Sequence, residues 1–392
     1  MALKQISVRT TWFLCALVSI VLLMPYTTQG YIVMAICTIC VILLTKSRVT
    51  NAGFLMLFYF VLCFFFNNAI TGGENTVKDI LNALAIFLLV GFRPNVNTKG
   101  LEPAFILILL CCILFSQFIV SMQIRPWSQM IADLYFDEDA RSYGSVMSMA
   151  EIINGANARA GGFLGNPNQC AKIVNLIFAA YMARNIKKRI FYPLWIVYIL
   201  IIAYAGSRTG MLVSAVLFLY FLYHRYKDKI DIVKFPFIAA FAVAVLVLVV
   251  HYIKSHFADM RMFDIESGME TSLGVKWDVI EGYLIYLEQT NGYLYALFGN
   301  FFNSNSPDLI VKLGIPLGFF DSDLGYLFYS YGIVGMFLII YCLIRQFAIC
   351  KISNIFWILL LWITTASVFL HFKFVLLFSM ILRMSANTKL DA

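Results

Sequence analysis

Charged side chains are scarce in this sequence. Only 13% of its 392 residues are charged, whereas 61% are hydrophobic, and the mean hydropathy is +0.84. An ordinary soluble domain is about a quarter charged and about half apolar. A water-soluble chain of this length could not bury so much apolar side chain. The composition therefore excludes a soluble enzyme, a disordered chain and a single membrane anchor on a globular body.

The sequence also lacks a disulfide framework and a recognisable metal site. All nine cysteines fall in or beside apolar runs, and the four histidines do not group. Cys37 and Cys40 have CxxC spacing, but they lie on an apolar helix face. This pattern excludes a disulfide-knit secreted domain, and we expect no metal.

Long apolar runs fill most of the chain. At about 20 residues per membrane span, they predict an all-α integral membrane protein with about twelve transmembrane helices, forming a single polytopic domain over residues 1–392. Strands of an outer-membrane barrel would alternate polar and apolar residues, and runs such as Phe241–Val250 do not. The expected spans are Thr11–Pro25, Tyr31–Thr45, Gly53–Ala69, Ile80–Phe92, Ala104–Met122, Gln169–Arg184, Ile190–Ala205, Thr209–Tyr223, Phe235–Tyr252, Leu324–Ile344, Ile355–Leu370 and Phe374–Met384.

Lysine and arginine predict the orientation of these spans. With the N-terminus inside, eighteen of the 29 basic residues fall in the short inside segments and ten in the longer outside ones, while Lys172 lies in a span. By the positive-inside rule, both termini are cytoplasmic. Two large extracytoplasmic loops follow, at about Gln123–Asn168 and Lys254–Asp323. The net charge of +8 then reflects topology, and no nucleic-acid partner is expected.

The two long loops contain segments with helical spacing of apolar residues. Short amphipathic helices are expected at Trp127–Leu134 and Ser145–Ile153. In the second loop an apolar stripe suits a helix on the membrane surface, which either covers the bundle or cradles a lipid substrate. Its residues are Trp277, Ile280, Leu284 and Leu287.

Polar residues gather where the first loop meets the sixth span. Asn166 or Asn168 could cap this helix, with Lys172 one turn further on reaching outward. Alternatively, the helix N-terminus and Lys172 form part of a phosphate or polar-lipid site.

Arg208 stands in a very tight outside turn, Gly206–Gly210, between two apolar runs. An arginine at the membrane face needs a partner. It either snorkels to lipid headgroups or binds a diphosphate, for which its planar fork is suited.

The second loop carries further candidates. Arg261 and Lys276 either pair with neighbouring carboxylates or bind substrate. Asp321 and Asp323 flank Ser322 at the start of a late span. Either could cap the helix, or could instead orient or deprotonate an acceptor hydroxyl.

Together, and in this order, the motifs resemble those of the O-antigen polymerase and ligase superfamily, over about residues 159 to 392. The similar segments are Arg159–Gln169, Ser207–Gly210, Gly274–Trp277 behind Arg261, Leu297–Gly299, and Asp321-Ser322 with Gly332 and Gly335. Two positions depart from the family pattern: Lys276 stands where arginine is frequent, and Asp321 where ligases usually have histidine. The second departure favours a Wzy-type polymerase.

The resemblance implies a metal-independent glycosyltransferase without cofactors, in the bacterial cytoplasmic (inner) membrane. It would transfer an undecaprenyl-diphosphate-linked glycan to a hydroxyl of another lipid-linked repeat unit, with membrane lipid around it and a chain-length regulator protein as a candidate partner. Arg208 and Asp321 would be catalytic. Arg159, Asn166, Asn168, Lys172, Arg261 and Lys276 would bind substrate. The alternatives are an O-antigen ligase acting on lipid A core and, from another class, a lipid-linked oligosaccharide flippase or transporter.

Overall fold

The structure is a computed structural model. It describes residues 7–25, 27–71, 77–96, 101–122, 124–135, 161–185, 191–226, 280–289, 292–300, 323–349 and 371–385. These residues are mostly helical, and every predicted span that falls on them is a helix. Two predicted spans, Phe235–Tyr252 and Ile355–Leu370, lie outside the described residues, as does the amphipathic helix expected at Ser145–Ile153.

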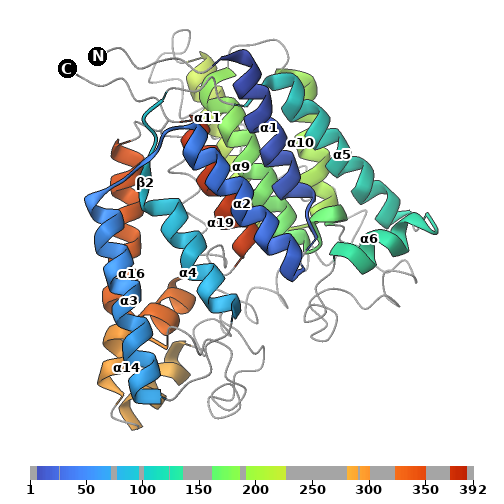
Figure 1. The fold of residues 1–392 in the computed structure, drawn as a ribbon. Helices are drawn as coiled ribbons and strands as arrows, with labels where there is room; N and C mark the ends of the chain where they lie inside the picture. Colours follow the sequence, from blue (N-terminus) through green and yellow to red (C-terminus); the bar gives the residue numbers. More distant parts are fainter. Residues whose placement is uncertain are drawn as a thin grey trace. The chain divides into compact units, whose positions relative to one another are not determined.

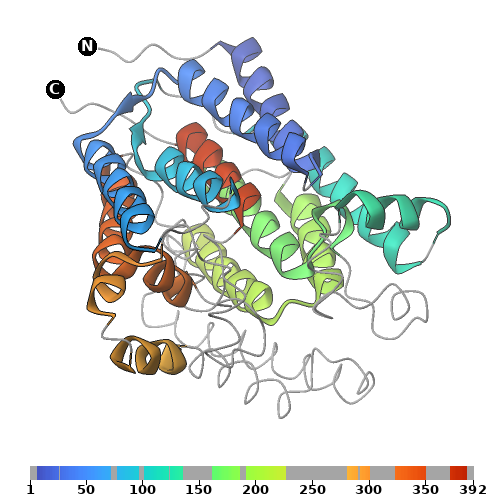
Figure 2. The same ribbon diagram turned by 60° about the horizontal axis from the view of Figure 1, so that its bottom comes forward.

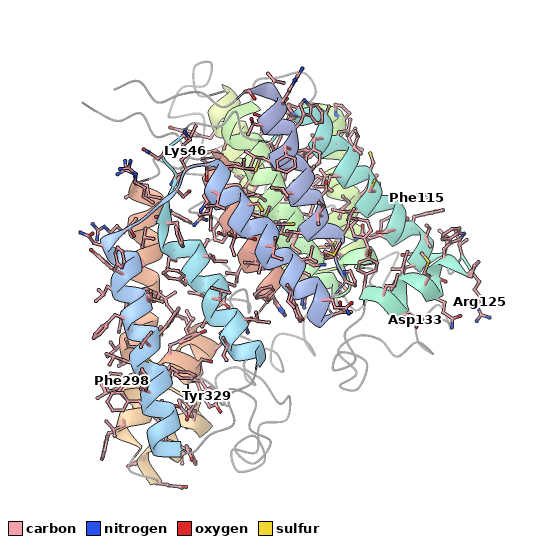
Figure 3. All side chains as sticks on the ribbon, viewed as in Figure 1. Lys46, Phe115, Arg125, Asp133, Phe298 and Tyr329 are labelled. Atoms are coloured by element: carbon pink, nitrogen blue, oxygen red, sulfur yellow. The ribbon has the colours of Figure 1, made fainter. Side chains whose placement is uncertain are left out.

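Two of the helices, Pro103–Ser121 and Asp323–Ala348, are long and apolar enough to cross a membrane. Six shorter apolar helices of 10–17 residues accompany them in the described part of the chain. Large apolar side chains also point outward: Phe54, Phe58 and Phe115 are each at least 60% exposed, and Figure 3 labels Phe115 on the outer face of its helix. Such surfaces fit a lipid environment, and the full set of twelve spans stays a prediction.

By its internal contacts the chain divides into two compact units. The first comprises Met1–Glu102, Leu273–Asn354 and Leu360–Ala392, and the second comprises Pro103–Ser272 and Ile355–Leu359.

In the first unit, one helix forms the centre of a small bundle. All residues of α19 (Phe372–Ser385) are buried. The helix contacts α1 (Val8–Leu23), α2 (Thr28–Leu44) and α4 (Val77–Val90) (Figure 1). Hydroxyl caps start the first two: Ser7 Oγ accepts from Thr10 N at 3.2 Å, and Thr27 Oγ1 from Gly30 N at 3.1 Å.

Of the remaining helices of this unit, α3 (Asn51–Thr71) and α16 (Asp323–Ile349) contact α4, and α14 (Tyr293–Phe298) packs on α16. A further helix lies over 280–289. The strands β1 (Arg48–Val49) and β2 (Phe92–Arg93) form an antiparallel ribbon at the ends of α2 and α4.

The second unit contains α5 (Pro103–Ser121), α6 (Trp127–Tyr135), the 3₁₀ turn η1 (Gly162–Leu164), α9 (Pro167–Asn185), α10 (Phe191–Ala205) and α11 (Arg208–Tyr226). The helix predicted at Trp127–Leu134 is confirmed as α6. Residues 170–182 of α9 are all buried, and this helix contacts α5, α10 and α11 (Figure 2).

Candidate functional site

The first family-like motif forms a tight turn that leads into α9. Gly162 and Gly165 have positive φ angles of 57° and 71°, which glycine adopts without steric cost. A Cβ on Gly162 would overlap Ser116 Oγ of α5, and this hydroxyl accepts from Phe163 N at 3.2 Å. The glycines therefore let the turn lie directly against α5.

Asn166 ends this turn and caps α9. Its Oδ1 accepts a hydrogen bond from Asn168 N at 2.8 Å, and Pro167 occupies the first helical position. Of the two asparagines considered as the cap, Asn166 holds that position, while Asn168 is exposed.

The second motif starts α11 in a similar way. Gly206 has a φ of 56°, and Ser207, which is 3% exposed, accepts a hydrogen bond from Gly210 N on its Oγ at 3.2 Å. Ser207 is thus the N-cap, and Arg208 is the first residue of α11.

The structure brings the starts of α9 and α11 together. A Cβ on Gly210 would lie 2.5 Å from the Cβ of Ala171, so only glycine permits this approach. Asn175 Nδ2 of α9 donates to the Gly210 carbonyl at 3.1 Å. The positive ends of two helix dipoles therefore lie side by side, an arrangement that favours an anion.

A buried polar network holds this arrangement in place. Tyr198 Oη of α10 donates to Asn175 Oδ1 and lies 2.7 Å from Ser214 Oγ of α11. Ser214 Oγ also donates to the Gly210 carbonyl at 2.8 Å. Since all three side chains are 6% exposed or less, the network links α9, α10 and α11 through polar groups that are costly to leave unbonded.

Lys172 lies in the first turns of α9, next to Ala171, and is only 4% exposed. The side chain is therefore enclosed, and the choice between a helix that is only capped and a phosphate or polar-lipid site stays open. The amino group belongs to a helix start that lies beside a second helix N-terminus, and its charged form would add to the positive potential of this region.

In the first unit, two further motif segments contact each other although they are far apart in sequence. Gly299 and Gly332 have φ angles of 76° and 64°. A Cβ on Gly299 would overlap the backbone of Ser330–Gly332, and one on Gly332 would overlap that of Leu297 and Phe298. The two backbones thus touch where neither residue has a side chain.

Gly332 breaks α16 into two halves, whereas the sequence predicted one continuous span over Leu324–Ile344. The carbonyls that the break frees find partners. Tyr331 O accepts from Tyr59 Oη of α3, and Tyr329 O accepts from Asn300 N at 2.8 Å. Phe298 and Tyr329, labelled in Figure 3, lie at this junction. Broken helices in membrane proteins occur where protein groups satisfy the backbone, commonly near binding sites.

The helix over 280–289 packs on the first half of α16 through Tyr283, which is fully buried. Asn300 Nδ2 donates to Tyr283 Oη at 3.0 Å, and the ring lies 5.0 Å from that of Tyr329. Burial raises the pKa of Tyr283, so its hydroxyl stays neutral at physiological pH. Of the predicted stripe, Ile280, Leu284 and Leu287 fall on this helix, and Trp277 lies outside the described residues. Leu287 is buried and Leu284 is 50% exposed, and the position of the helix on the membrane surface stays a prediction.

Several predicted site residues lie outside the described residues, namely Arg159, Arg261, Lys276 and Asp321. Asp323, the alternative to Asp321, is the first residue of α16 and is fully buried. In the part of the chain that the structure describes, no group of three His, Cys, Asp or Glu residues is placed to hold a metal.

Sequence reasoning missed Asn175, Tyr198, Ser214 and Tyr283 as residues that support the motifs. The first and third carried a usable signal, because each is a polar residue inside an apolar run, where polar groups are retained only with partners.

Comparison with the models of known protein families and with curated proteins found no match to this chain.

Proposed function

We propose that this protein is a polysaccharide repeat-unit polymerase of the Wzy type. Its donor is a glycan linked to undecaprenyl diphosphate, and its acceptor is the hydroxyl of another lipid-linked repeat unit. The observation that carries the proposal is the pairing of segments: the start of α9, directly after the first motif, packs on Ser207–Gly210 through Ala171 and Asn175 in one unit, and Leu297–Gly299 packs on Gly332 in the other. Unrelated stretches that resembled a family by chance would have no reason to pair in this way.

The site around the starts of α9 and α11 takes the donor diphosphate. In the reaction the acceptor oxygen forms a bond to the anomeric carbon while the bond from that carbon to the diphosphate oxygen breaks. The acceptor proton passes to a base, for which Asp321 is the candidate, and the lipid diphosphate leaves. Its growing negative charge requires fixed positive groups. Arg208, Lys172 and the two helix N-termini supply them.

The acceptor decides between this proposal and the alternative of an O-antigen ligase. Deleting the gene and separating surface polysaccharide on a gel distinguishes the two. A polymerase deletion leaves core carrying one repeat unit, whereas a ligase deletion leaves bare core. The flippase or transporter alternative predicts that the purified protein forms no polymer from lipid-linked repeat units.

Arg208 gives the sharpest test at the level of chemistry. Arg208→Ala removes the charge, and Arg208→Lys keeps it but loses the planar fork that grips two phosphate oxygens. Both should slow polymer formation by about 10²–10³, the effect of removing one such stabilising group in other enzymes. Polymer formed from purified lipid-linked repeat units is the measurement, with protein level checked by blot.

The matched control is Arg125→Ala. Arg125 is an exposed arginine of the same unit, near the start of the loop predicted at Gln123–Asn168. The substitution should leave the rate unchanged. Near-normal polymer from Arg208→Ala would assign Arg208 to headgroup contact only.

A further inference from the structure

The ribbon of β1 and β2 places two arginines directly opposite each other. Arg48 pairs with Arg93 in the antiparallel register, and Val49 pairs with Phe92. Directly opposite residues lie on one face of a ribbon, and like charges in that position repel each other. On the other face, the ring of Phe92 lies 5.3 Å from that of Phe87.

The ribbon backbone is firmly held, so the two arginines cannot separate by moving their strands. Thr50 N donates to Gly91 O at 2.9 Å, and Asn95 N donates to Thr45 O at 3.1 Å. A Cβ on Gly53 would overlap the backbone of Gly91, which fixes the start of α3 against the end of α4. An anion between the guanidinium groups would relieve their repulsion.

Two further cations lie at the same end of the unit. Lys46 precedes β1 and is exposed. Arg345 of α16 is next to Gln346, whose Nε2 donates to Phe92 O, and Cys342 Sγ of the same helix lies 3.8 Å from Ala52 O. Among the described residues, none of these four cations has a carboxylate in ion-pair contact.

An exposed apolar surface begins beside these cations. On α3, Phe54, Phe58 and Phe65 follow one another at helical spacing and are 61%, 60% and 64% exposed. On α16, which packs against α3, Tyr341 and Phe337 are 54% and 61% exposed. Cations at one end of such a surface match a phospholipid, which has a charged phosphate and apolar chains.

We propose that Arg48 and Arg93, with Lys46 and Arg345, form a binding site for the headgroup phosphate of an anionic phospholipid of the inner leaflet. Its acyl chains lie along the exposed apolar side chains of α3 and α16. Basic sites at the cytoplasmic ends of helices bind such lipids. The proposal rests on the orientation predicted from positive charge and is independent of the proposed glycosyl transfer.

The test uses the full chain, purified in neutral detergent and freed of lipid. Binding of phosphatidylglycerol and of phosphatidylcholine is titrated by native mass spectrometry. The wild type should bind phosphatidylglycerol more tightly. The double variant Arg48→Gln/Arg93→Gln should bind it about 30-fold more weakly, since each cation near a membrane surface contributes about fivefold. Arg345→Gln alone should show a smaller loss in the same direction.

The matched control is Arg9→Gln/Arg125→Gln, which removes the same charge at two exposed positions elsewhere. It should bind phosphatidylglycerol like the wild type. Equal loss in the control, or equal binding of both lipids by the wild type, overturns the proposal. Displacement of the lipid by millimolar glycerol phosphate would also overturn it, because the site would then recognise a free phosphate without the chains.

Discussion

At the scale of single residues, Asn175 links the two helices whose N-termini form the candidate anion site. Its Nδ2 holds the Gly210 carbonyl two residues after Arg208, while its Oδ1 accepts from Tyr198 and Ser214. A small change at Asn175 therefore alters where α11 begins relative to Lys172, although Asn175 itself has no reacting role.

Asn175→Ala should lower stability by about 1–3 kcal/mol, because it leaves buried polar partners unbonded. It should also slow polymer formation, because the start of α11 is no longer held against α9. Thermal unfolding and polymer formation measure the two effects. Thr38→Val is the control, since Thr38 is equally buried but bonds only within its own helix, to Met34 O at 2.9 Å. If Thr38→Val slowed turnover as much as Asn175→Ala, the effect would be one of stability alone.

The two aspartates before and at the start of α16 are expected to differ. Asp321→Ala should reduce chain extension at normal protein level, because Asp321 has the family-like spacing to Gly332. Asp323→Ala should act mainly on protein level, because Asp323 is fully buried in the first turn of the helix, where a cap contributes about 1 kcal/mol. Chain-length profiles and blots of both variants measure this. Greater loss of extension from Asp323→Ala would move the catalytic assignment by two residues.

At the scale of elements, apolar runs predicted helices well because in lipid a helix is the one way to pair the backbone of a lone segment. All ten predicted spans on described residues are helices, with ends that differ by a few residues. The break at Gly332 could not be predicted. A glycine inside an apolar run gives no sign of its φ angle, and this angle depends on Gly299, 33 positions away along the sequence.

The candidate site, like the fold, was predicted only in part from the sequence. The motifs and their caps were visible in sequence, because capping residues and glycines act locally. Their pairing across the chain was not visible, because it depends on side chains such as Asn175 and Tyr59 that bond distant carbonyls.

Gly332→Ala should destabilise the protein by about 2 kcal/mol or more. Alanine at a positive φ costs about 1–2 kcal/mol, and its Cβ would also overlap the backbone of Leu297 and Phe298. Thermal unfolding in detergent is the measurement. Val334→Ala, two residues on and 41% exposed, is the control and should change stability little. A stable Gly332→Ala protein would mean that α16 can run straight through this position.

At the scale of the whole molecule, the distribution of charge and the two compact units carry different information. Most lysines and arginines fall in the segments predicted to lie inside, and this bias predicts which ends of the helices meet the cytoplasm. The units show which helices fold together, namely α5 to α11 in one and the remaining described helices in the other. The anion site at the starts of α9 and α11 lies in the second unit, and the proposed lipid site lies in the first. The lipid proposal and the assignment of outside loops depend on the same orientation.

Reporter fusions test that orientation directly. A fusion after Lys188 should report the cytoplasm, and one within Lys254–Leu313 should report the outside, because three apolar runs separate the two points. Two of these runs are the helices α10 and α11, and the third is Phe235–Tyr252, outside the described residues. A fusion after Tyr226 is the internal control: α10 and α11 form an even pair, so it should match the fusion after Lys188. Matching signals from Lys188 and Lys254–Leu313 would remove Phe235–Tyr252 from the spans. The second loop would then lie inside, Arg261 and Lys276 could not meet a periplasmic substrate, and the polymerase proposal would fail.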